Sequence, residues 1–177
     1  MKREMEYFKI IKNDDEDNSL DIIILKEPTS AFQLEIETSF LYTTEIESEI
    51  KNGTCDISYS LGNTLETLEA DIFSINIKKN SEGKLYAKID ICGYEADYII
   101  AHAIILSIHY KIPIIITKSV SKLGYYGDNI EEKDFKKART ENLQKILQNA
   151  LTKENYEKAS KIRDEIDSRK GKIKNGT

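Results

Sequence analysis

The fold is decided by residues 71–117, which read DIFSINIKKNSEGKLYAKIDICGYEADYIIAHAIILSIHYKIPIIIT. Apolar and polar residues alternate over Ile72–Ile77 and again over Leu85–Ile91, and the Gly-containing break Asn80–Gly83 separates the two segments. This alternation around a turn is typical of a β-hairpin with one buried face. The hairpin is therefore the expected start of a sheet.

A helix and a further strand follow the hairpin in the same stretch. Gly93 predicts a short turn, after which Asp97 can cap a helix over Tyr98–Tyr110. This helix carries little polar surface, which predicts a core helix lying across the sheet. Ile112–Ile116 is an uninterrupted apolar run, as expected of a short strand buried on both faces. One hydrophobic core therefore begins here.

The residues before this stretch predict three more strands. Glu6–Lys12 and Leu20–Lys26 predict an antiparallel pair, joined by the acidic turn Asn13–Asn18. Phe32–Glu37 alternates like a half-exposed strand. All three segments fit the same sheet as the hairpin.

Two helices are expected between these strands and the hairpin. Thr38 or Ser39 can cap a helix that reaches Ile50 and is stopped by Asn52–Gly53, and a second helix is expected over Ser60–Glu69. The predicted fold class is α+β, a compact sheet with helices packed on it, followed by a C-terminal antiparallel helical hairpin.

Composition limits the classes of function. The chain has 177 residues, 32% of them charged, and a net charge of −5, which excludes a general basic field that would attract nucleic acid. Contact with nucleic acid would have to be local, for example at Lys78–Lys79. Cys55 and Cys92 lack metal-binding spacing and fit a reducing cytosol. No apolar run approaches the roughly 20 residues that cross a bilayer, so a cytoplasmic protein without membrane contact is expected.

The C-terminal residues predict the helical hairpin. One apolar stripe at helical spacing comprises Leu143, Ile146, Leu147, Ala150 and Leu151. Asn155 can cap a second helix, whose apolar face comprises Tyr156, Ala159, Ile162 and Ile166. A break this short makes the helices antiparallel, and so small a pair needs either its own domain or a partner to complete a core.

Four segments are expected along the chain. An α+β domain is expected over residues 1–124 and a charged linker over residues 125–139. The helical hairpin is expected over residues 140–170 and a flexible tail over residues 171–177.

The α+β segment resembles the bifunctional nuclease (BFN) family between Leu20 and Gly124. The residues that carry the resemblance are Leu65–Ile72, Glu82–Ile89, Glu95–Asp97, Ala103–Ile104 and Ile112–Ile114. The resemblance implies a compact α+β domain that self-associates into a homo-oligomer and acts on DNA and RNA. It implies Asp97 as a catalytic residue, with Glu95 and His102 near enough in sequence to join it. Mg²⁺ or Mn²⁺ is the cofactor that such a set could bind.

The same segment leaves a second, non-catalytic interpretation open. After Asp97 the family usually has a small residue and then Arg, Pro, Ser and Asp, whereas residues 98–102 here read Tyr-Ile-Ile-Ala-His. Phosphodiester hydrolysis needs groups that place a metal or activate water. The alternative is therefore an oligomeric scaffold or adaptor.

The C-terminal hairpin resembles the UVR motif, named for UvrB and UvrC, over Leu143–Leu151 and Lys153–Ile166. The motif implies pairing with a second UVR hairpin or with a partner protein of DNA repair or stress response. Tyr156 and Ile162 are expected to anchor the buried seam, with Arg163 at its edge. The expected partner-binding residues are Leu147, Leu151, Tyr156, Ala159, Ile162, Arg163 and Ile166.

Overall fold

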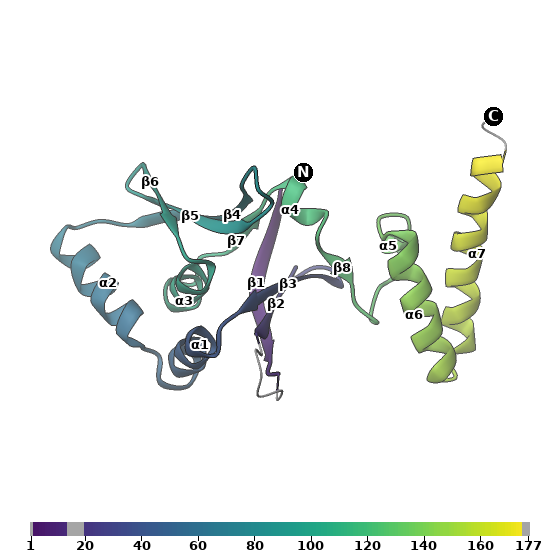
Figure 1. Cartoon of the computed structure of the whole chain (residues 1–177), viewed down its shortest axis with the longest axis horizontal. Coiled ribbons are helices and arrows are strands. Elements are labelled where there is room, and N and C mark those ends of the chain that lie inside the picture. The colour runs from purple at the N-terminus through teal and green to yellow at the C-terminus, as the bar shows by residue number, and fades with distance from the viewer. Residues whose placement is uncertain (1, 14–19, 175–177) are drawn as a thin grey trace. The chain divides into compact units, whose positions relative to one another are not determined.

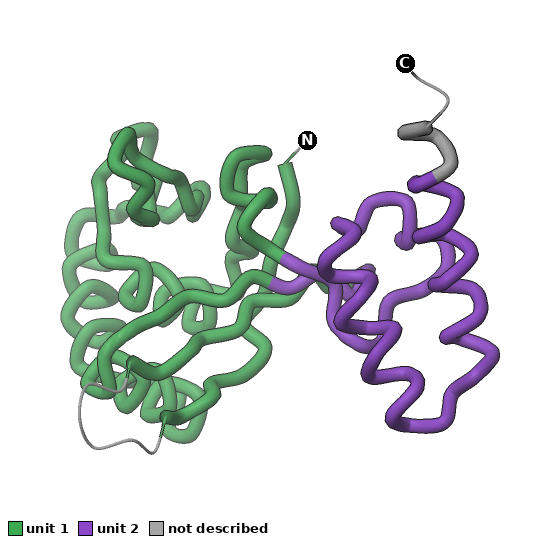
Figure 2. Tube along the Cα trace, turned by 45° about the vertical axis from the view of Figure 1, so that its right-hand side comes forward, with its two compact units in different colours: residues 1–28, 34–124 green, residues 29–33, 125–177 purple. Residues whose placement is uncertain are grey.

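The computed structural model describes residues 2–13 and 20–174 of the chain. These residues fall into two compact units (Figure 2). Unit 1 comprises residues up to 28 together with 34–124, and unit 2 comprises residues 29–33 together with those from 125 onward. Each unit is described by itself below.

The strands confirm the predicted sheet (Figure 1). In the described residues they are β1 (Arg3–Ile11), β2 (Asp21–Lys26), β3 (Phe32–Thr38), β4 (Ile72–Lys79), β5 (Leu85–Ile91), β6 (Tyr94–Tyr98), β7 (Ile114–Ile116) and β8 (Tyr125–Tyr126). Their order is β6-β5-β4-β7-β1-β2-β3, and β8 pairs with Phe32 and Gln33 at the start of β3. The β4–β5 hairpin and the antiparallel β1–β2 pair are as predicted. Of the acidic turn Asn13–Asn18, all but Asn13 lies outside the described residues.

The helices complete the α+β fold class that the sequence predicts. They are α1 (Phe40–Asn52), α2 (Asp56–Thr67), α3 (Ile100–Tyr110), α4 (Lys118–Ser121), α5 (Glu132–Phe135), α6 (Thr140–Thr152) and α7 (Tyr156–Lys174). Helix α1 ends as expected, because Gly53 adopts φ 74° and donates its backbone N–H to the carbonyl of Glu49 at 2.8 Å.

Helix α3 is the core helix of unit 1, as its apolar sequence predicts. It contacts α1, α2 and strands β1, β4 and β5, and Ile104, Ile105 and Leu106 are fully buried. Strand β7 runs parallel to β4 and antiparallel to β1, and its Ile114 and Ile116 are also fully buried. The apolar core of unit 1 therefore lies between this helix and the sheet.

The predicted role of Asp97 as a helix N-cap is wrong. Asp97 lies within β6, and the helix begins at Ile100 with Ile99 at the N-cap position. The reason is the turn at Cys92 and Gly93, which both adopt positive φ, 50° and 88°. A two-residue turn of this kind favours a second hairpin, so the chain continues antiparallel to β5 before it enters the helix.

The second predicted helix begins earlier than expected, at Asp56 instead of Ser60. Cys55 is its N-cap residue, and its backbone N–H donates a hydrogen bond to Ser58 Oγ at 3.0 Å. Cysteine is an uncommon cap, so the usual cap residues do not mark this start in the sequence.

Residues 125–139, expected to be a charged linker, contain β8 and α5. Tyr126, Ile130 and Phe135 are at most 4% exposed, and Asp134 is 2% exposed with Lys137 Nζ at 2.7 Å. Charged neighbours hide these apolar residues in the sequence pattern. Helix α7 also continues through residues 171–174.

Within the part of the chain that the structure describes, no helix has both the length and the apolar character needed to cross a membrane.

Candidate functional site: the C-terminal hairpin and the acidic strand

The turn between α6 and α7 is built as the sequence predicts. Asn155 caps α7, because its Oδ1 accepts a hydrogen bond from the backbone N–H of Lys158 at 3.2 Å. Asn155 also donates its backbone N–H to the carbonyl of Ala150 at 2.8 Å. These bonds fix the antiparallel direction of the two helices.

The hairpin has a buried seam formed by the predicted helical faces. Six seam residues are at most 6% exposed: Leu143, Ile146, Ala150, Ala159, Ile162 and Ile166. Unit 2 also buries Ile130, Phe135 and Ala138, and α5 contacts α7. Other residues of unit 2 therefore cover the seam, and the hairpin belongs to a small hydrophobic core within unit 2.

Arg169 joins the end of the hairpin to the residues before it. Its guanidinium donates to the carbonyl of Phe135 at 2.7 Å and to the carbonyl of Ala138 at 2.8 Å. It also bonds Glu165 Oε1 at 2.9 Å. Carbonyls at the end of the short helix α5 are thus satisfied by a charged donor from α7.

A second polar cluster lies beside the turn of the hairpin. Asp128 accepts hydrogen bonds from Asn149 and from Lys153, both at 2.9 Å, and these two partners hold the pKa of its carboxyl below the ordinary value. Lys158 donates to the backbone carbonyls of Asp128 and Ile130, and burial lowers the pKa of its ammonium group. The loop before α5 is therefore attached to both helices.

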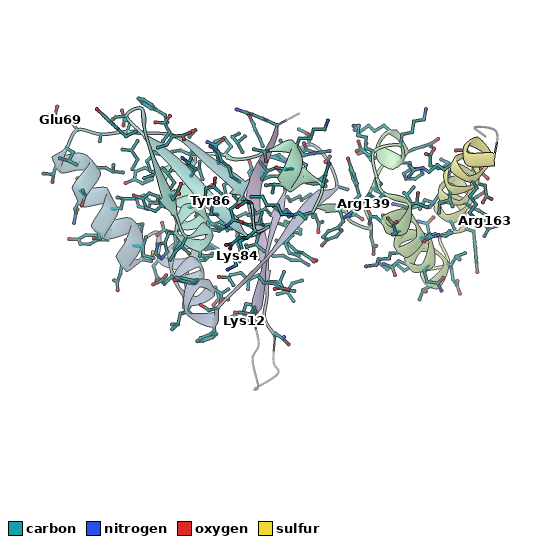
Figure 3. The ribbon with its side chains drawn as sticks, turned by 45° about the horizontal axis from the view of Figure 1, so that its top comes forward. Lys12, Glu69, Lys84, Tyr86, Arg139 and Arg163 are labelled. Atoms are coloured by element: carbon teal, nitrogen blue, oxygen red, sulfur yellow. The ribbon has the colours of Figure 1, made fainter. Side chains whose placement is uncertain are left out.

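Three apolar side chains near the turn remain accessible. Tyr156 is 65% exposed, and Leu147 and Leu151 are partly exposed. We name these three residues the tip patch. Arg163, one of the expected edge residues, is exposed on α7 (Figure 3). Of the two expected anchors, Ile162 is buried, whereas Tyr156 is the first residue of α7 and precedes the face buried within the hairpin. The role of Tyr156 as an anchor toward a partner stays a prediction.

The candidate catalytic acids of unit 1 lie on β6. Glu95 and Asp97 project from the same face of the strand, since they are two residues apart. Lys88 on β5 lies 3.0 Å from Glu95 and 3.7 Å from Asp97, and Lys78 lies 3.6 Å from Glu95. The hydrogen bond from Lys88 holds the pKa of Glu95 below its ordinary value. Both carboxylates are therefore paired with ammonium groups.

His102, the third candidate, is placed differently. It lies in the first turn of α3, where its ring meets the ring of Tyr42 edge-on, with centroids 5.4 Å apart. Within residues 2–13 and 20–170, no three His, Cys, Asp or Glu side chains lie close enough together to hold a metal ion. In the described residues, Glu95 and Asp97 therefore lie together, and His102 does not form a metal-binding cluster with them.

Comparison with protein-family models identifies one part of the chain. The model of the UvrB/uvrC motif matches residues 137–168. This match spans α6 and most of α7, so the chain carries a UVR motif, which is associated with protein interaction and DNA repair. No curated protein matched the chain.

Sequence reasoning missed two cations that organise this motif, Lys158 and Arg169. Arg169 could have been noticed, because it lies three residues after Ile166 and continues the face formed by Ala159 and Ile162. Lys158 gives no such signal, since its acceptors are backbone carbonyls some 28 to 30 residues earlier.

Proposed function

We propose that this chain is a protein-interaction protein, which binds a partner through the tip patch of its UVR hairpin. The observation that carries the proposal is the exposure of Tyr156 within a motif whose seam is otherwise buried. Aromatic residues exposed beside aliphatic ones are frequent anchors of protein interfaces. Because the seam is already filled, the hairpin is ordered before the partner arrives, which reduces the entropy lost on binding.

The partner proposed is a protein of DNA repair or stress response, or a second UVR hairpin. Helices α6 and α7 carry charges of both signs around the tip patch, and the exposed apolar side chains supply its non-polar contact area. Arg163 lies on the same exposed helix and supplies a cation at the edge of the interface.

Substitution of Tyr156 by alanine is expected to weaken partner binding by about 2 kcal/mol, roughly 30-fold in Kd. The full chain is first used as bait to isolate a partner protein. The affinity of that partner for each purified variant is then measured by titration. Tyr59→Ala is the matched control, because Tyr59 is equally exposed, at 67%, and lies in α2 of unit 1. Equal capture and equal sedimentation of both variants would contradict the role of the tip patch.

The alternative is the nuclease activity that the BFN resemblance implies, with Mg²⁺ or Mn²⁺ as cofactor, nucleic acid as substrate and a homo-oligomer as the active form. What favours it is the shared face of Glu95 and Asp97. What weighs against it is Lys88, whose ammonium group lies 3.0 Å from Glu95 and 3.7 Å from Asp97 and competes with a metal ion for both carboxylates.

We therefore expect no hydrolysis of duplex DNA or RNA, with Mg²⁺ or Mn²⁺, above that of an identically purified Asp97→Asn variant. Incubation of labelled substrates with and without chelator measures this. Cleavage that depends on metal and is lost in Asp97→Asn, with unchanged melting of the protein, would establish the nuclease instead.

A further inference from the structure

Strand β6 leaves one side without a paired strand in the described part of unit 1. It is the end strand of the sheet, and β5 pairs with its other side (Figure 1). The two-residue turn makes Ile91 and Tyr94 a hydrogen-bonded pair, so the alternation of an antiparallel ladder directs the N–H groups of Glu95 and Asp97 outward. An added strand can bond to such groups.

The two faces of β6 differ in character. Glu95 and Asp97 are 50% and 68% exposed on one face, and Lys88 contacts both and lowers the pKa of Glu95. The other face carries Tyr94, Ala96 and Tyr98, and Tyr94 is 81% exposed. A strand that matches this edge has cations on one face and apolar residues on the other.

A second copy of β6 does not fit this requirement. Antiparallel pairing of two copies centred on Ala96 would place Glu95 of each opposite Asp97 of the other. Like charges directly opposite one another destabilise a strand pair. The acidic residues therefore oppose self-pairing and favour a basic strand.

A groove of about 490 Å³ continues from the end of β6. It lies wholly in unit 1, where the β6–α3 connection meets the ends of β3 and β5. Its lining is mainly apolar, including Ile36, Leu85 and the half-exposed Ile99, and its acidic residues are Glu37 and Asp97. The groove thus repeats the combination of apolar surface and negative charge found along the strand.

We propose that the β6 edge and this groove bind an extended segment of a partner protein in which lysine or arginine alternates with apolar residues. Backbone bonds to the outward groups of β6 supply part of the affinity. The cations of the segment share the half-exposed carboxylates of Glu95 and Asp97 with Lys88, which contacts both from β5. Its apolar residues cover Tyr94 and enter the groove beside Ile99. This site is independent of the UVR hairpin.

A labelled peptide that alternates lysine and valine tests the proposal, with fluorescence anisotropy measured against the full chain. We expect it to bind more tightly than a peptide of equal composition with its lysines in one block, and than a peptide alternating glutamate and valine. Hydrogen exchange should show protection of the amides of Glu95 and Asp97 when the peptide is bound.

Asp97→Lys should weaken binding of the alternating peptide about tenfold, and Asp97→Asn should weaken it by less. Glu82→Lys is the control, because it makes the same charge change at a 71% exposed side chain on the β4–β5 turn. Equal weakening by Asp97→Lys and Glu82→Lys, or equal binding of the blocked peptide, would overturn the proposal. Protection confined to residues outside β6 and the groove would overturn it as well.

Discussion

Substitution of Ile162 by alanine is expected to destabilise unit 2 by about 3 kcal/mol. Ile162 is fully buried in the seam between α6 and α7. The change removes buried methyl and methylene groups and leaves a cavity that neighbouring side chains fill only partly. Since the stability of a whole domain is of the order of 5–15 kcal/mol, this loss is a large fraction for so small a unit.

Arg163→Ala is the matched control for this prediction. Arg163 is the next residue along α7 but is exposed, so its loss should change the free energy of unfolding by no more than about 0.5 kcal/mol. The chain has no tryptophan, so hydrogen exchange with mass spectrometry is a better readout than fluorescence. Peptides from residues 140–170 should exchange faster in Ile162→Ala, whereas peptides from 72–91 should not change. Equal exchange in the two variants would show that the seam does not stabilise the hairpin.

The seam and the central hairpin could be predicted because their signals are local. Alternation over Ile72–Ile77 and Leu85–Ile91 and the helical spacing from Leu143 to Ile166 each depend on one element and its burial. The boundary at Asp97 could not be predicted from the same signals. A carboxylate before an apolar helix fits both an N-cap and an exposed strand, and the positive φ of Cys92 that decides between them is not visible in the sequence.

Contacts between distant residues account for most of what the sequence did not reveal. The charged residues around Phe135 have the sequence pattern of a linker. In the structure, however, Arg169, which lies 34 residues later, donates a hydrogen bond to the Phe135 carbonyl. In the same way, His109 has the sequence context of an exposed imidazole near a helix end, yet its partner Glu49 is 60 residues away. Hydrophobic spacing carries no information about such polar pairs.

The second large effect is expected at this polar pair. Glu49 is 2% exposed at the end of α1, where Oε2 accepts a hydrogen bond from Ser58 Oγ at 2.5 Å and Oε1 lies 2.8 Å from His109 Nδ1. The carboxylate thereby joins α1 to α2 and α3. Glu49→Ala leaves the histidine and the serine hydroxyl without this acceptor, and it also opens a cavity. We expect unit 1 to lose about 3 kcal/mol of stability.

Glu47→Ala is the control, because Glu47 lies on the same helix and pairs with Lys12. Its carboxylate is 2.8 Å from Lys12, but both side chains are more than 40% exposed, so solvent screens their attraction and the loss of this pair should change stability far less. Urea denaturation followed by circular dichroism compares the two variants. A Glu49→Gln variant retains the size of the side chain and an acceptor for Ser58, so its loss should lie between the other two. If Glu49→Ala were no less stable than Glu47→Ala, then packing alone would hold the three helices together and the buried carboxylate would contribute nothing to their arrangement.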